Sequence, residues 1–96
     1  QANARQNGVE VDVRRATLDQ VPEGEADLIV ANIIASVIID ILPDVVARLK
    51  PGGRFLASGI IAEKKEAVSE AMTEAWLLPV GVHEQDGWVA LLAMKP

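Results

Sequence analysis

Cysteine and tyrosine are absent from this sequence of 96 residues, which has one phenylalanine and one histidine. The lack of cysteine excludes disulfide scaffolds, thiolate metal sites and cysteine nucleophiles, and it suits a reducing compartment such as the cytoplasm. The single histidine, His83, excludes a histidine-rich metal site and is the only candidate for a Ser-His-Asp triad. We expect His83 to be a solvated strand residue, and we expect no metal site.

A membrane-spanning run and a basic surplus are also lacking. The longest apolar stretch, residues 33–42, is interrupted by Ser36 and Asp40 and falls far short of the roughly 20 residues that a membrane helix needs. The net charge of −5 leaves no excess of lysine and arginine to displace counterions from a nucleic acid. We therefore expect no membrane contact and no direct nucleic-acid contact. An acidic chain fits a basic protein partner, although a solvated acidic surface would carry the same charge.

Short apolar strands alternate with helical patterns along the chain. The sequence predicts strands at residues 9–13, 28–31, 54–58, 78–84 and 88–94, with Gly59 ending the third. It predicts helices at residues 33–49, broken near Pro43, and at residues 63–76. Asp86-Gly87 is a strong hairpin signal. This order predicts an α/β fold with a mostly parallel sheet and a terminal antiparallel hairpin.

Three segments resemble the second half of class I methyltransferases, which have a Rossmann-like fold. They are residues 27–33 (DLIVANI), 49–55 (LKPGGRF) and 87–91 (GWVAL). Residues 30–35 (VANIIA) together with residues 58–63 (SGIIAE) are similar to a narrower group, the PrmA family. Its members use S-adenosylmethionine to methylate lysine and terminal amines of a basic ribosomal protein. The resemblance departs from the family at residues 74–76, where the last helix lacks the usual glycine before its aromatic residue, Trp76.

The resemblance also implies that part of such an enzyme is not among these residues. The glycine-rich cofactor loop, the acid that binds the ribose and the amino-terminal substrate domain have no counterpart in the sequence. Residues 1–6 read as the tail of a helix. We therefore expect residues 1–96 to be the carboxy-terminal part of a methyltransferase domain, with half of one site and no activity alone.

Asn32 is the candidate catalytic residue and would also touch the cofactor. A free lysine has a pKa near 10.4, so about one amine in a thousand is neutral at neutral pH, a free-energy cost of about 4 kcal/mol. A neutral amide oxygen can accept the N–H groups of that neutral amine, whereas a carboxylate would hold the ammonium charged. The carboxyl end of a central strand is where ligands bind in such sheets. The alternative is that Asn32 caps the following helix.

The resemblance assigns further residues to the two sides of this site. It places Thr17 and Leu18 against the adenine, although a plain connecting loop is an equal alternative. Ile33 and Ile34 would line the substrate channel, but an apolar pair at a helix start is often core. Ser58 and Gly59 would lie at the same edge. We expect Trp88 to be an anchoring core residue rather than part of this edge.

Two other functions stay open. One is a methyltransferase of another substrate class; glutamine-directed enzymes usually have Asn-Pro-Pro-Tyr where this chain has residues 32–35 (NIIA). The other is a non-enzymatic half-domain that self-associates. In the parent fold a further strand lies beside residues 28–31, so we expect this edge to be covered by a second copy of the chain or by a displaced strand 9–13.

Overall fold

The structure is a computed structural model that describes residues 9–13 and 18–96. The expectations for residues 1–6 and for Thr17 lie outside the described residues. In chain order the elements are β2 (Glu10–Asp12), η1 (Leu18–Gln20), β3 (Ala26–Asn32), α1 (Ala35–Arg48), β4 (Leu49–Ile61), η2 (Ala62–Lys64), α2 (Lys65–Glu74), β5 (Leu78–Gln85) and β6 (Trp88–Met94). No helix in this part of the chain is long and apolar enough to cross a membrane.

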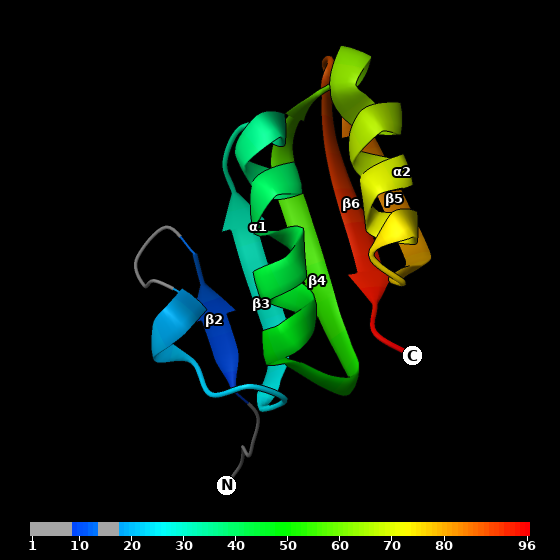
Figure 1. The fold of residues 1–96 in the computed structure, drawn as a ribbon. Coiled ribbons are helices and arrows are strands. Elements are labelled where there is room, and N and C mark those ends of the chain that lie inside the picture. The colour runs from blue at the N-terminus through cyan, green and yellow to red at the C-terminus, as the bar shows by residue number, and fades with distance from the viewer. Residues whose placement is uncertain (1–8, 14–17) are drawn as a thin grey trace, which may run out of the picture.

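The described strands form a five-stranded sheet with the order β2-β3-β4-β6-β5. β2, β3 and β4 are parallel, whereas β6 runs antiparallel to both of its neighbours. Figure 1 shows α1 and α2 side by side on one face of this sheet. Asp86 and Gly87 both have positive φ, 54° and 83°, as the two-residue turn between β5 and β6 requires. The predicted α/β fold and its terminal hairpin are confirmed.

β2 lies on the edge of β3. Glu10, Val11 and Asp12 are the register partners of Leu28, Ile29 and Val30, and the pairing is parallel. The Val13 amide donates a hydrogen bond of 2.9 Å to the Val30 carbonyl, which extends the pairing. Two arrangements were predicted for this edge of β3, and the structure has the one in which strand 9–13 covers it. A second copy of the chain could pair with this edge only if β2 were released.

α1 is continuous through Pro43, so the predicted break there is wrong. Proline lacks the amide that would bond four residues back, which costs about 3 kcal/mol in a helix interior. The ring of Pro43 is exposed, and the helix is held against the sheet on both sides of it by Ile38, Leu42 and Val45, which are at most 2% exposed. Burial of these side chains outweighs the lost hydrogen bond.

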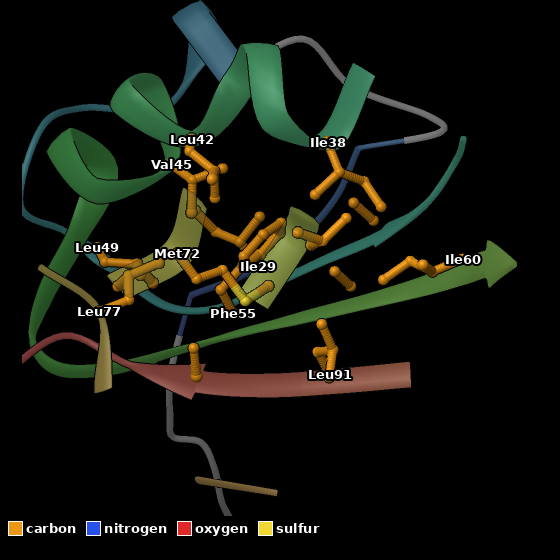
Figure 2. Packing of buried hydrophobic residues seen from close by; sticks show 14 of the residues in the cluster. Ile29, Ile38, Leu42, Val45, Leu49, Phe55, Ile60, Met72, Leu77 and Leu91 are labelled. Atoms are coloured by element: carbon orange, nitrogen blue, oxygen red, sulfur yellow. The ribbon is translucent and has the colours of Figure 1, made fainter. Parts of the chain in front are cut away.

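The core lies between the helices and the sheet, as Figure 2 shows for Ile29, Phe55, Val45 and Met72. Ile29 and Phe55 are fully buried, because α1 and α2 cover their face. Leu28 and Val30 point to the opposite face and are only half-buried. A continuously apolar run like that of β3 is typical of a strand buried on both faces, but no helix among the described residues covers the second face.

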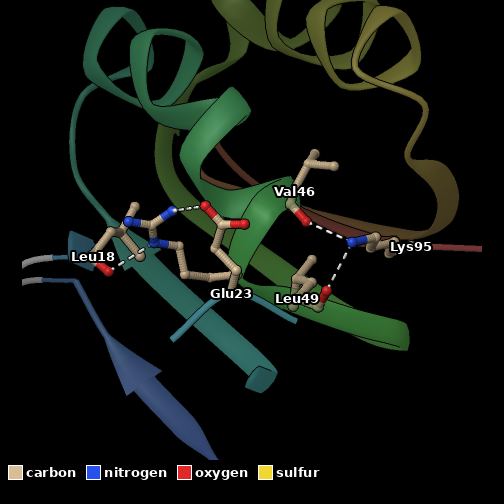
Figure 3. A network of polar contacts seen from close by, with 6 residues as sticks. Leu18, Glu23, Val46, Leu49 and Lys95 are labelled. Carbon is tan, nitrogen blue, oxygen red and sulfur yellow. Dashed lines mark hydrogen bonds and ion pairs between the residues drawn. The ribbon is translucent and has the colours of Figure 1, made fainter. Parts of the chain in front are cut away.

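Polar side chains fasten the carboxyl end of α1. Lys95 Nζ donates to the carbonyls of Val46 and Leu49 at 2.8 and 2.9 Å, as the dashed lines in Figure 3 show. Arg48 Nε donates to the Leu18 carbonyl at 2.9 Å. A cation at this end of a helix satisfies carbonyls that have no partner within the helix.

Candidate functional site

Asn32 is the last residue of β3, at the carboxyl edge of the sheet. Its side chain is exposed, and its register partner on β4 is Ser58. The residue at the N-cap of α1 is Ile34, and the cap has no side-chain hydrogen bond. The interpretation of Asn32 as a helix cap is therefore wrong. In the part of the chain that the structure describes, the Asn32 carboxamide makes no hydrogen bond to a protein group.

A β-bulge in β4 faces Asn32. Ala57 pairs with Leu91 and Ile60 pairs with Val89, so Ser58 and Gly59 together stand opposite Ala90 alone. Gly59 has φ +80°, a conformation that glycine adopts without strain. The prediction that Gly59 ends the strand is wrong, because β4 resumes pairing and runs on to Ile61. Bulges of this kind re-aim side chains and are frequent beside active sites.

Gly59 is in close contact with Asn32. A Cβ built at Gly59 would overlap Asn32 Oδ1, and it would lie 3.4 and 3.5 Å from the carbonyl oxygen and the amide nitrogen of Ile33. The Asn32 oxygen thus occupies the space that a side chain at residue 59 would need. This contact joins the end of β3 to the bulge of β4.

Two hollows flank the bulge, and Gly59 and Trp88 line both of them. One, of about 350 Å³, is largely apolar and is also lined by Ile34, Ile61 and Lys64. The other, of about 340 Å³, is lined by Ser58 and by the hairpin residues His83, Gln85 and Asp86. The carboxyl edge of the sheet therefore offers two recesses side by side, which differ in the residues that line them.

Trp88 and Ile34 are both exposed here. Trp88 is 55% exposed and Ile34 is 65% exposed, so the prediction of Trp88 as an anchoring core residue is wrong. Trp88 begins β6 and pairs with Ile61, which places it at this edge of the sheet. Sequence reasoning missed Ile61 and Trp88 as lining residues, because only the bulge brings them together. Ile33 is half-buried and packs against the core.

The residues assigned to the adenine side lie apart from this edge or are not described. Thr17 is outside the described residues. Leu18 is 8% exposed, its side chain belongs to the hydrophobic core, and its carbonyl accepts the hydrogen bond from Arg48. Its part in cofactor binding stays a prediction.

Asp27 lies at the opposite, amino edge of the sheet. Lys50 Nζ lies 2.9 Å from Asp27 Oδ1, and the Val9 amide donates to Asp27 Oδ2 at 2.7 Å. These hydrogen bonds to the charged form lower the pKa of Asp27 from its ordinary value. Asp27 thus has a structural role, because it ties the start of β3 to β4 and to the residue that precedes β2.

Residues 1–96 match the family described as "Ribosomal protein L11 methyltransferase (PrmA)" along their whole length. The chain belongs to this family. A ribosomal protein L11 methyltransferase of Symbiobacterium thermophilum is 84% identical over 94 residues, which are 98% of this chain and 31% of that protein. One from Desulforapulum autotrophicum is 46% identical over 82 residues, 85% of this chain and 27% of that protein. The chain thus spans about a third or less of these PrmA relatives.

Solved structures agree with the family. A ribosomal protein L11 methylase of Lactobacillus delbrueckii subsp. bulgaricus superposes with a TM-score of 0.69 at 28% identity, over 73% of this chain and 37% of that one. The 16S rRNA methyltransferase RsmC of T. thermophilus, in complex with AdoMet and guanosine, has a TM-score of 0.62 at 21% identity, over 83% of this chain and 23% of that one. The second likeness concerns the fold alone. The first agrees with a segment of a PrmA-type methyltransferase domain.

Proposed function

We propose that this chain forms the acceptor side of the active site of a protein N-methyltransferase that modifies lysine and terminal amines of ribosomal protein L11. The observation that carries the proposal is the Asn32 carboxamide, exposed at the carboxyl end of β3 and without a protein partner among the described residues. An amide in this position has its oxygen available for a ligand. The family membership supports the proposal independently.

Asn32 Oδ1 would accept an N–H of the neutral substrate amine. An uncharged acceptor does not favour the ammonium form, whereas a carboxylate at this position would raise the amine's pKa. Holding the N–H groups also fixes the direction of the nitrogen lone pair, and orientation of this kind is a large part of catalysis between two bound groups. Ile34, at the mouth of the apolar hollow, fits the methylene stem of a lysine.

The cofactor of this family would be S-adenosylmethionine, which supplies an electrophilic methyl group on a sulfonium. The described residues fit one end of such a ligand, because the Asn32 amide has no protein partner among them and contacts Gly59, which lines both hollows. The resemblance adds Thr17 and Leu18 as residues that would hold the adenine.

The substrate is expected to be a basic protein. The chain carries a net charge of −5, and a negative surface draws a cationic partner by long-range attraction. Ser58, Ile33 and Gly59 would line the approach to Asn32. We place this reaction in the cytoplasm, where ribosomal proteins are assembled.

A chimera tests the proposal. These 96 residues replace the aligned segment of the Symbiobacterium thermophilum relative, which is 84% identical to them, and the chimera is supplied with radiolabelled S-adenosylmethionine and ribosomal protein L11. We expect the label to enter L11 at a rate close to that of the unaltered relative. A folded chimera that binds the cofactor and leaves L11 unlabelled, while the relative labels it, contradicts the proposal.

A further inference from the structure

We infer that Gly59 is a positioning residue for Asn32: the absence of a side chain at the β4 bulge is what seats the Asn32 carboxamide. The inference rests on the proposed function, because it names the group that holds the acceptor amide in place. Gly59 itself offers no chemistry to a substrate. Its effect on the reaction passes through Asn32.

The contact is specific to one atom of one side chain. The Cβ of any other residue at position 59 would overlap Asn32 Oδ1, whereas its distances to Ile33 are ordinary van der Waals contacts. The overlapping atom is the end of a rotatable side chain, so the Asn32 amide would swing aside and the backbone would stay. An alanine at residue 59 would therefore move the acceptor oxygen rather than dismantle the edge.

The bulge gives the reason for this arrangement. Ser58 and Gly59 together oppose Ala90, which pushes the backbone of β4 out at the level of Asn32. In a regular strand, successive side chains point to opposite faces of the sheet, so the side chain after Ser58 would point to the face opposite that of Ser58. Here Gly59 has a positive φ and the position of its missing Cβ falls on Asn32 Oδ1, so only glycine leaves room for the amide.

Gly52 is a matched control within the same strand. It has φ +86°, close to that of Gly59, but a Cβ built on it meets nothing within 4 Å. It lies in the irregular start of β4, between the register pairs Ala26–Leu49 and Leu28–Arg54, at the edge opposite Asn32. Gly52→Ala therefore introduces the backbone strain of a side chain at positive φ without the contact to Asn32.

The experiment is a double-mutant cycle in the chimera, with Gly59→Ala, Asn32→Ala and the double variant. Gly59→Ala is expected to lower kcat about 10- to 100-fold, as for a reacting group moved by about 1 Å, and to leave the KM for S-adenosylmethionine nearly unchanged. Gly52→Ala should keep kcat close to that of the chimera. In the Asn32→Ala background, Gly59→Ala should cause no further loss. Independent, multiplying losses, or a kcat for Gly59→Ala equal to that of Gly52→Ala, would overturn the inference.

Thermal unfolding of the parent chimera and of the same four variants tests the contact without any catalysis. Gly59→Ala should lower Tm more than Gly52→Ala does. In the Asn32→Ala background, the Tm loss caused by Gly59→Ala should shrink to about that caused by Gly52→Ala. This arm stays decisive if the Gly59→Ala chimera folds poorly, since the double variant should then recover folding. It also separates the two proposals: an inactive parent chimera counts against the proposed function, while equal Tm losses in both Asn32 backgrounds count against the role of Gly59.

Discussion

Trp76 and Leu77 are neighbours in the chain, yet Trp76 is 83% exposed and Leu77 is 2% exposed. Trp76 follows the end of α2 with φ +70°, the left-handed conformation that ends many helices and that glycine usually provides. Leu77 then turns into the core. Trp76 thus adopts the backbone conformation in which a glycine is usual at the end of a helix.

Trp76→Gly should stabilise the chain. A side chain at positive φ costs about 1–2 kcal/mol, and the greater freedom of glycine in the unfolded state offsets part of this gain. We expect the free energy of unfolding in urea to rise by about 0.5–1 kcal/mol. Trp76→Ala is the matched control, because it removes the indole and keeps the strain. A Trp76→Gly variant less stable than Trp76→Ala would contradict the backbone strain inferred for residue 76.

Lys95 should stabilise the carboxyl end of α1. Its ammonium group donates to two helix-terminal carbonyls, and a charged donor of this kind contributes about 1–2 kcal/mol. Lys95→Met is expected to lower the free energy of unfolding by that amount. Lys64→Met should change it little, because Lys64 is exposed and makes no ion pair among the described residues. Equal effects of the two substitutions would rule out the capping role.

Asp27 should make the stability depend on acid pH. Its pKa in the folded state is lowered, first by the hydrogen bond from Lys50 and then by the Val9 amide. A lowered folded pKa gives a contribution that is present above the ordinary carboxyl pKa and is lost as the pH falls through the lowered value. Native Tm should therefore exceed that of Asp27→Asn at neutral pH, and the gap should close in acid. A gap independent of pH would contradict this linkage.

Elements with strong local signals could be predicted from the sequence. The alternation of residues 9–13, the apolar run of β3 and the Asp86-Gly87 turn each specify their structure within a few residues, so these strands and the hairpin could be predicted. Asn32 could be placed at the carboxyl edge because it directly follows the predicted strand 28–31; in the structure it is the last residue of β3, which pairs in parallel with β4.

Features that depend on contacts between distant segments could not be predicted. Packing of Leu42 and Val45 on the sheet carries α1 past Pro43, and no local pattern reports that burial. The bulge at Gly59 depends on the register of β4 with β6, whereas the local sequence around this glycine predicts the end of a strand. The same bulge sets Trp88 at the edge, although tryptophan in a hairpin strand is commonly part of the core.

The isolated 96 residues should not bind S-adenosylmethionine at sub-millimolar concentration. Asn32 and the loop near Leu18 can offer one or two hydrogen bonds of about 1 kcal/mol each, which cannot offset the several kcal/mol needed to immobilise a ligand. Isothermal calorimetry should show no saturable heat. A micromolar dissociation constant at one-to-one stoichiometry would require a cofactor pocket elsewhere in the chain.

The turnover of the Asn32→Ala chimera tests the central claim most directly. If the Asn32 carboxamide aligns the substrate amine, kcat for methylation of ribosomal protein L11 should fall about 100- to 1,000-fold, as when one positioned polar group is removed from a transition state. The KM for S-adenosylmethionine should change far less, and the chimera should keep its Tm, because Asn32 is exposed and caps no helix. A folded Asn32→Ala chimera with near-normal kcat would contradict the account.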